Sequence, residues 1–200
     1  MDILAVGANF ARSSSPGTSP ESMSTEIRKL TYQDYVCFPD DGKRHEIIGG
    51  DHYMNPAPST YHQYVSRRLH FQLYSKIELV ERGSVICAPV DVQLTESDIV
   101  QPDIVVVLKE NRIITPTKVK GAPDHLIEIL SPSTESNDKT LKRSLYERTG
   151  VGEYWIVDPF EQTLTQLVLE NGRYVDQRVT EKRISVTYLH DVDVDLNQVW

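Results

Sequence analysis

The chain has few cysteines, no long hydrophobic segment and no excess of basic residues. Its 200 residues include two cysteines, Cys37 and Cys87, whose spacing matches no metal-binding motif. We therefore expect two free thiols, as in a reducing cytoplasm. No apolar segment approaches the roughly 18 residues that a membrane-spanning helix needs. The sequence thus predicts a cytoplasmic protein with no membrane partner.

Basic residues are outnumbered by acidic ones. There are 21 Lys and Arg against 29 Asp and Glu, which gives a net charge of −8. This balance counts against non-specific nucleic-acid binding, which usually needs a basic face. It does not exclude a nuclease, because acidic residues at a metal site contribute to the deficit and a bound cation offsets their charge.

The first 29 residues differ in composition from the rest of the chain. They are rich in Ser, Pro and Gly, and no basic residue precedes their short apolar part. This composition predicts a disordered leader rather than a secretory signal. Residues 30–200 suit a single domain that is long enough to bury its own core.

Hydrophobic periodicity and turn residues predict an α/β (α+β) domain with one mixed β-sheet flanked by helices. Two short strands are expected around the turn at Gly49 and Gly50. Asn171 and Gly172 mark the turn of a hairpin over residues 163–179. Further strands are expected at residues 84–94, 103–108, 124–130 and 152–158.

Three helices are expected. Thr31 and Asp34 form a capping-box pattern that begins a short helix, with Tyr35 and Val36 facing inward. Two further helices are expected at about residues 59–79, with Val65, Leu69 and Leu73 on one stripe, and at about residues 137–149.

One acidic residue interrupts an apolar strand. Glu128 shares a strand face with Leu126 and Leu130, while Ile127 and Ile129 point to the opposite face. Both faces are apolar enough to be buried, and a buried carboxylate without a partner costs several kcal/mol. Glu128 therefore needs either a bound cation or a buried basic side chain beside it.

Asp103 is the candidate to share a cation with Glu128. It follows Pro102 and opens the segment DIVVVL. If the two strands are neighbours, both carboxylates reach one edge of the sheet. Mg²⁺ and Mn²⁺ prefer such oxygen ligands, and Mg²⁺ takes one or two carboxylates together with water and phosphate oxygens. The alternative is an Asp that only initiates a strand after proline.

The helix at residues 137–149 carries a lysine that could reach these carboxylates. Asp138, Lys142 and Tyr146 are spaced four apart and share one face, while Leu141 and Leu145 are expected to pack on the sheet. A lysine at that place could orient a water molecule or stabilise charge on a phosphate. The alternative is an Asp–Lys ion pair on a solvated face.

Other charged residues remain open between two interpretations. Glu46, in the segment HEII, either joins the acidic cluster or is exposed on the hairpin. Four basic residues are candidates for phosphate contacts, although exposed basic side chains usually only increase solubility: Arg67, Arg68, Lys139 and Arg143.

Taken together, these segments resemble a known family. RHEIIGG, APVDVQL, QPDIVVV, APDHLIEILSPST and NDKTLKRSLYERTGVGEYWIVDP, followed by a Gly-Arg-Tyr hairpin, resemble in this order the Uma-type endonucleases of bacteria. That family belongs to the PD-(D/E)XK restriction-endonuclease-like superfamily. The resemblance covers about residues 30–195. It implies a restriction-endonuclease-like core, DNA as the partner and, usually, a homodimer.

The resemblance also implies roles for individual residues. Asp103 and Glu128 would hold Mg²⁺ or Mn²⁺, and Lys142 would join them as the third catalytic residue. Three further residues would complete the pocket: Glu46, Asp138 and Tyr146.

One position departs from the superfamily pattern. The pattern has a lysine two residues after the glutamate, where this chain has Leu130. Lys142 matches the run D-xxx-K-xxx-Y on the following helix and would replace that lysine. His62 also matches a family position, but a lone helical histidine more often packs or caps a helix, so we assign it no catalytic role.

We therefore expect a divalent-metal-dependent endonuclease that hydrolyses DNA phosphodiester bonds. One alternative is a catalytically silent relative that binds nucleic acid or a protein partner. The acidic composition and the missing lysine favour that alternative, whereas the pair Asp103 and Glu128 favours the enzyme. Another alternative is hydrolysis of a small nucleotide. The enzyme hypothesis requires that the side chains of Asp103, Glu128 and Lys142 come together within reach of one metal ion.

Overall fold

A computed structural model describes residues 28–179 and 182–200. Except for its last two residues, the predicted leader at 1–29 lies outside the described part of the chain. The two cysteines are exposed and unpaired within the described residues, as expected. No helix among the described residues is long and apolar enough to cross a membrane.

The mixed α/β class is confirmed, but the strands form three sheets rather than one. The six-stranded sheet has the order β11-β10-β9-β8-β6-β3, with bounds Arg173–Val179, Thr163–Glu170, Glu153–Asp158, His125–Ile129, Ile104–Leu108 and Gly83–Cys87. The five-stranded sheet has the order β2-β1-β5-β4-β7, with bounds Asp51–Asn55, Arg44–Ile48, Asp98–Val100, Val92–Thr95 and Val119–Lys120. The strands β12 (Arg183–Val186) and β13 (Leu189–Asp195) form the third sheet.

The prediction of a single strand at residues 84–94 is wrong. This segment forms two strands, β3 and β4, which belong to different sheets. The chain leaves the six-stranded sheet after β3 and enters the five-stranded sheet at β4. Pro89 lies between them, and a proline has no N–H group to donate to a ladder of hydrogen bonds. The sequence between Cys87 and Val92 therefore ends one strand and redirects the chain to another sheet.

The helices begin where their caps predict. The Ser59 hydroxyl accepts a hydrogen bond from the His62 N–H at 3.2 Å, and the Asp34 carboxylate accepts one from the Thr31 N–H at 2.8 Å. Val36, however, is 59% exposed, so its predicted inward orientation is wrong. The helical segments are α1 (Tyr32–Tyr35), α2 (Thr60–Leu73) with the π-helical turn η1 (Tyr74–Glu78), α3 (Glu135–Asn137), the π-helical turn η2 (Asp138–Lys142), α4 (Arg143–Thr149) and the 3₁₀ turn η3 (Leu196–Gln198).

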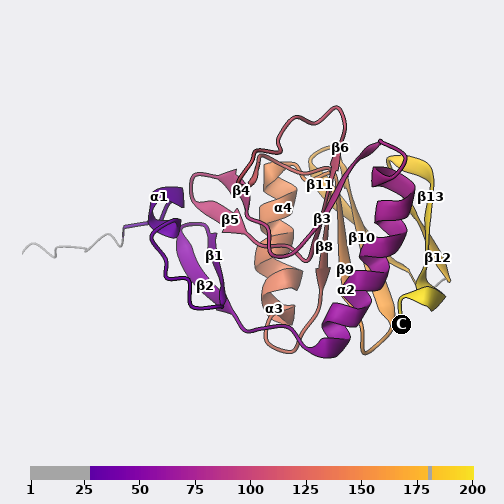
Figure 1. The fold of residues 1–200 in the computed structure, drawn as a ribbon, viewed down its shortest axis with the longest axis horizontal. Helices are drawn as coiled ribbons and strands as arrows, with labels where there is room; N and C mark the ends of the chain where they lie inside the picture. Colours follow the sequence, from indigo (N-terminus) through magenta and orange to yellow (C-terminus); the bar gives the residue numbers. More distant parts are fainter. Residues whose placement is uncertain (1–27, 180–181) are drawn as a thin grey trace, which may run out of the picture.

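The six-stranded sheet lies between two helical layers (Figure 1). On one face, Val65, Leu69 and Leu73 of α2 pack with Ile127 and other residues of the sheet and with residues of β12 and β13. On the other face, residues of α4 and of the five-stranded sheet form a second core. Leu145 is buried in this second core as predicted, but Leu141 is 37% exposed, so its predicted packing on the sheet is wrong.

The strand order brings the two candidate metal ligands together. β6 pairs with β8 in antiparallel register, with Ile104 opposite Ile127, and β8 pairs with β9 in parallel. One residue beyond this register, Asp103 lies opposite Glu128. The expectation that these two strands are neighbours is confirmed.

His125 makes the stability of the fold depend on pH. Its ring is fully buried at the start of β8 and packs edge-on against Trp155, with 4.5 Å between ring centroids. Burial lowers the pKa of His125 from 6.5 to about 4, although Glu153 and Asp124 act in the opposite direction. The folded chain therefore keeps His125 neutral, whereas the unfolded chain protonates it. The neutral His125 ring makes its full contribution to the free energy of unfolding above pH 6.5. About 3 kcal/mol of that free energy is lost as the pH falls to 4.

We expect His125→Phe to remove this part of the pH dependence. Urea unfolding of both proteins at pH 6.5 and at pH 4 measures it, because the other titrating groups are common to the two chains. The variant should gain stability relative to wild type at the lower pH. A difference that is the same at both pH values would show that the buried imidazole does not resist protonation.

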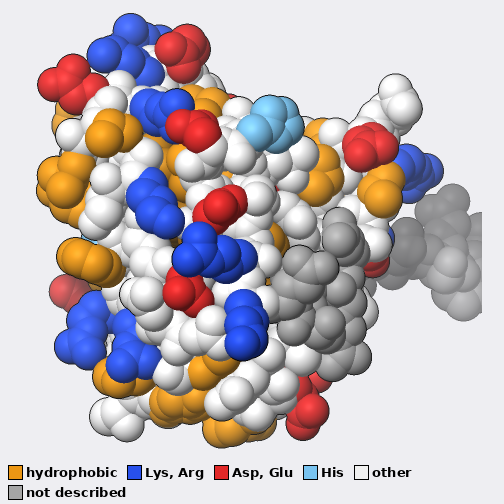
Figure 2. All heavy atoms as spheres, turned by 90° about the vertical axis from the view of Figure 1, so that its right-hand side faces the viewer, with side chains coloured by type: hydrophobic (Ala, Val, Ile, Leu, Met, Phe, Trp, Pro, Cys, Tyr) orange, Lys and Arg blue, Asp and Glu red, His pale blue; other side chains and the backbone are white. Residues whose placement is uncertain are grey.

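The surface that carries α2 and the C-terminal strands is mixed in character. Figure 2 shows Lys and Arg side chains close to hydrophobic ones on this side, with acidic side chains between them. This face of the molecule therefore carries charges of both signs next to hydrophobic side chains.

Candidate functional site

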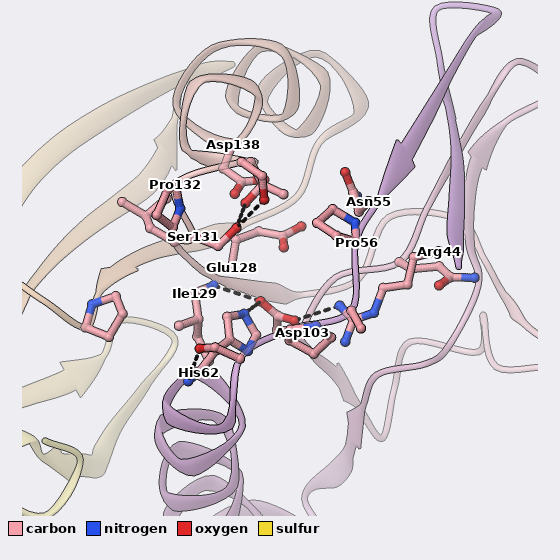
Figure 3. A pocket seen from close by; sticks show the side chains of 18 of the residues that line it. Arg44, Asn55, Pro56, His62, Asp103, Glu128, Ile129, Ser131, Pro132 and Asp138 are labelled. Atoms are coloured by element: carbon pink, nitrogen blue, oxygen red, sulfur yellow. Dashed lines mark hydrogen bonds and ion pairs between the residues drawn. The ribbon is translucent and has the colours of Figure 1, made fainter. Parts of the chain in front are cut away.

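A cavity of about 360 Å³ lies where several chain segments meet at one end of the six-stranded sheet. Its walls come from residues 55–59 at the end of β2, the first turn of α2, residues 101 and 103 before β6, and residues 128–134 at the end of β8. Further lining residues are Arg44, Asp138, Lys142, Pro159 and Phe160. Figure 3 shows Asp103, Glu128 and Asp138 around this space. The chain thus gathers acidic side chains from two strands and one helix at a single cavity.

Glu128 has the basic partner that its burial requires. Its Oε1 accepts hydrogen bonds from Lys142 Nζ at 3.0 Å and from the Tyr146 hydroxyl at 2.8 Å. Both partners come from the helix that follows the Ser131–Thr134 loop, on the face predicted from their four-residue spacing. The buried ion pair left open by the sequence is therefore present, and it lines a cavity.

Lys142 is the centre of the acidic cluster. Its ammonium lies 3.0 Å from Glu128, 3.1 Å from Glu46 and 3.4 Å from Asp138. The side chain is only 3% exposed, so an Asp–Lys pair on a solvated face is excluded. Because Glu46 is also buried, the alternative of an exposed hairpin residue is excluded as well.

Glu46 is held by groups from both neighbouring strands. Its Oε1 accepts a hydrogen bond from the Gln101 N–H at 2.7 Å, and its Oε2 accepts one from the Asn55 amide at 2.8 Å. These bonds fix the carboxylate behind Lys142. Glu46 therefore positions the lysine rather than facing the cavity itself.

Burial and like charges set the protonation of the cluster. Burial raises the pKa of Glu128 well above its usual value, and the nearby carboxylates of Asp138, Asp103 and Glu46 raise it further, against the attraction of Lys142. Burial alone would lower the pKa of Lys142, but the negative charges of Glu128, Glu46 and Asp138 outweigh it and raise that pKa. Lys142 is therefore the ammonium of the cluster, and Glu128 binds a proton more readily than an exposed carboxylate does.

Asp103 is held by three donors. Its Oδ1 accepts from Arg44 at 2.9 Å, and its Oδ2 accepts from His62 Nε2 at 3.0 Å and from the Ile129 N–H at 2.9 Å. Burial would raise the pKa of Asp103, but the hydrogen bond and charge of His62, with the bonds from Ile129 and Arg44, lower it. Asp103 is thus the carboxylate that stays ionised.

Two of these contacts were not predicted from the sequence. His62 was assigned no role, yet the first turn of α2 aims its ring at Asp103. Arg44 was not considered at all. It lies two residues before Glu46 on β1, and this strand spacing places both side chains on the same face, which could have indicated its position.

The oxygen atoms at the cavity fit a divalent cation with few protein ligands. Glu128 Oε2 has no hydrogen-bond partner among the described residues. In the described part of the chain, no three acidic, His or Cys side chains are arranged to hold a metal ion by themselves. Mg²⁺ commonly needs only one or two carboxylates and completes its shell with water and phosphate oxygens. Asp103 and Glu128 fit that pattern.

The four basic residues considered for phosphate contacts do not line this cavity. Lys139 pairs with Glu135 at 2.6 Å, and Arg143 pairs with Asp176 at 2.8 Å. Arg67 and Arg68 lie farther along α2. Arg44 and Lys142 are the cationic side chains that line the cavity walls.

Comparisons with known proteins agree with this fold. The solved structure of a "putative nuclease" from Anabaena variabilis is similar, with a TM-score of 0.72 and 19% sequence identity, over 85% of this chain and 97% of that chain. At this identity the similarity shows the fold, which is the mixed α/β fold that the sequence predicted. The model of the Uma2 family, described as "Putative restriction endonuclease", matches residues 32–197. The chain belongs to the Uma2 family. No curated protein matches it.

Proposed function

We propose that this chain is a divalent-metal-dependent endonuclease that hydrolyses phosphodiester bonds in DNA. The observation that carries the proposal is that Asp103 and Glu128, on neighbouring strands, line one cavity together with the buried Lys142. The family's description as a restriction endonuclease and the similar solved nuclease support it. Superfamily resemblance leads us to propose a homodimer as well, which light scattering would test.

Asp103 and Glu128 are the residues that would hold Mg²⁺ or Mn²⁺ in this site. When bound, such a cation polarises a phosphoryl oxygen and lowers the pKa of a bound water. Arg44 and His62 keep Asp103 ionised and oriented for this role.

Lys142 acts as a fixed positive charge rather than as a base. Its raised pKa keeps it protonated, so it donates to a phosphate oxygen on which negative charge builds up in the reaction. Glu46 and Asp138 hold the ammonium in place, and Tyr146 shares Glu128 Oε1 with it.

A specific observation favours a second candidate, a catalytically silent module that binds nucleic acid or protein. Asp103 and Glu128 already have charged partners within the chain, Arg44 and Lys142. A module that had lost its metal would need such internal pairs to remain stable.

Cleavage assays separate these candidates. We expect the wild-type chain to nick supercoiled DNA or to cut single-stranded DNA in Mg²⁺ or Mn²⁺, and to be inactive in excess EDTA. Binding of DNA without cleavage in either metal would support the silent module. Hydrolysis of free nucleotides without cleavage of DNA would contradict the endonuclease and support a nucleotide hydrolase.

His62 is predicted to position Asp103 and not to touch the substrate. His62→Ala should weaken Mn²⁺ binding and reduce cleavage by about 10- to 100-fold, which is typical for the loss of a side chain that orients a metal ligand. Calorimetric titration with Mn²⁺ and a cleavage assay measure both quantities. Gln63→Ala, at the next and exposed position of α2, is the control. Unchanged Mn²⁺ affinity in His62→Ala would contradict the positioning role.

A further inference from the structure

The proposed catalytic groups are too deeply buried for a closed duplex to reach. Asp103 and Glu128 are each 4% exposed. The cavity of about 360 Å³ is at the small end of the roughly 300–1,000 Å³ that small-molecule pockets occupy. A duplex is stiff over the length of such a site, whereas the backbone of an unpaired nucleotide can bend into a recessed cavity. The size of the cavity therefore suits one unpaired nucleotide.

The mouth of this cavity carries an exposed aromatic side chain. Phe160 lines the cavity and is 66% exposed, and its ring lies 6.0 Å from that of Tyr61 on α2. Tyr61 is anchored by a hydrogen bond from its hydroxyl to the Pro159 carbonyl at 3.2 Å. Exposed rings of this kind serve as platforms on which unpaired bases stack.

A second groove lies along the outer side of α2. Its volume is about 610 Å³, and its lining contains two arginines and two aromatic residues but no acidic residue: Arg67, Arg68, Phe71, Gln72, Asn197, Gln198 and Trp200. In a chain with a net charge of −8, a groove of this composition is locally basic. Figure 2 shows this side of the molecule, where basic and hydrophobic side chains lie together.

The side chains of the groove are arranged for stacking and charge pairing. Phe71 is 68% exposed, and the Arg68 guanidinium lies 3.9 Å from the centre of the Tyr64 ring. The Arg68 guanidinium also donates hydrogen bonds to the Trp200 main-chain oxygen at 2.5 Å and to the Tyr64 hydroxyl. Arg67 is exposed, and its guanidinium lies 5.3 Å from the centre of the Tyr64 ring. Tyr61, Tyr64, Arg68 and Phe71 follow one another at spacings of three and four, so they form one stripe along the helix.

The groove and the cavity are joined by α2 itself. The Tyr61 ring lies 6.0 Å from that of Phe160 at the cavity, and Phe71 lines the groove on the same stripe of the helix. At about 1.5 Å per residue, Tyr61 and Phe71 are about 15 Å apart along the helix axis. This distance equals roughly four stacked nucleotides at about 3.4 Å each.

We propose that the α2 groove binds single-stranded DNA, and that the strand runs from the groove past Phe160 into the cavity. This inference rests on the proposed function, whose substrate class it narrows. The bases stack on Phe71 and Phe160, and Arg67 and Arg68 contact the phosphates between them.

Binding to a cleavage-deficient full chain tests the groove without depending on catalysis. In the Glu128→Gln background, fluorescence anisotropy with a labelled single strand of about 20 nucleotides, and with the duplex of the same sequence, measures both affinities. We expect the single strand to bind at least about tenfold more tightly than the duplex. The double substitution Arg67→Ala and Phe71→Ala should weaken single-strand binding by about tenfold or more.

Arg112→Ala with Leu79→Ala is the matched control, because both residues are exposed and line neither the cavity nor the groove. Equal affinity for single strand and duplex, or unchanged binding after the groove substitutions, would overturn the inference. So would loss of a dimer in the groove variant, since the groove would then bind a second copy of the chain. If the chain binds single-stranded DNA tightly but the wild type cleaves no DNA, the proposed function is overturned and the inference about the groove stands.

Discussion

Glu128→Gln is expected to abolish DNA cleavage while the chain stays folded. The amide keeps the shape of the side chain and can still accept a hydrogen bond from Tyr146, which donates to Glu128 Oε1 in the wild type. It supplies no negative charge to a cation, so the loss should exceed the roughly 100-fold that follows removal of a group that only orients a metal ligand. Cleavage of supercoiled and single-stranded DNA in Mg²⁺ and in Mn²⁺ measures the effect.

The fold of this variant should not suffer. Burial and three neighbouring carboxylates oppose the charge of Glu128, and Lys142 retains Glu46 and Asp138 as partners. Thermal unfolding should therefore give a midpoint no lower than that of the wild type. Glu135→Gln, an exposed position on the same loop-to-helix segment, is the control for activity. Equal cleavage by Glu128→Gln and wild type would show that Glu128 is only structural.

Lys142→Met is expected to cause the largest loss of stability. The substitution removes the ammonium that lies within 4 Å of three buried carboxylates, those of Glu128, Glu46 and Asp138. Removing one partner of a buried ion pair costs about 3–5 kcal/mol, because the remaining charge has no compensation. Urea unfolding near pH 7 measures the difference, and cleavage should be lost as well.

The loss of unfolding free energy in Lys142→Met should become larger as the pH rises. Burial raises the pKa values of Glu128 and Asp138, and Lys142 opposes this rise. Without Lys142, both pKa values lie still further above those of the unfolded chain, so the folded state binds protons more tightly. The stability of the variant is therefore retained at low pH, near the ordinary carboxyl pKa of about 4, and is lost as the pH rises. Lys139→Met, on the surface three residues earlier, should change the free energy of unfolding by less than about 0.5 kcal/mol. If the two variants were equally stable near pH 7, the cluster would not depend on Lys142.

The sequence predicted which side chains lie close to Glu128 better than it predicted the contacts of Asp103. A carboxylate within an apolar strand requires a partner, and four-residue spacing on a helix places Lys142 and Tyr146 together. Both arguments use local rules, and both are confirmed by the hydrogen bonds to Glu128. The hydrogen bonds from Arg44 and His62 to Asp103 depend on how β1 and α2 pack against β6. No local sequence pattern predicts that packing.

In the fold, too, features set by adjacent residues could be predicted, and features set by distant strand pairing could not. The hairpin turn at Asn171 and Gly172 and the cap at Ser59 are set by adjacent residues, and both lie where expected. The separation of β3 and β4 into different sheets depends on strand pairing across the whole chain, so apolar alternation at residues 84–94 suggested one strand. Leu141 fits the helical pattern but is left partly exposed by the position of the helix on the sheet.

The most direct test of the account is the position of a bound metal ion. Crystals of the full chain soaked in Mn²⁺ would show the ion through its anomalous scattering. We predict one peak at the cavity, with oxygens of both Asp103 and Glu128 at about 2.0–2.6 Å, a range that spans Mg²⁺ and Ca²⁺ ligand distances. An empty cavity in crystals of a protein that cleaves DNA in Mn²⁺, or a peak coordinated by other residues, would contradict the account.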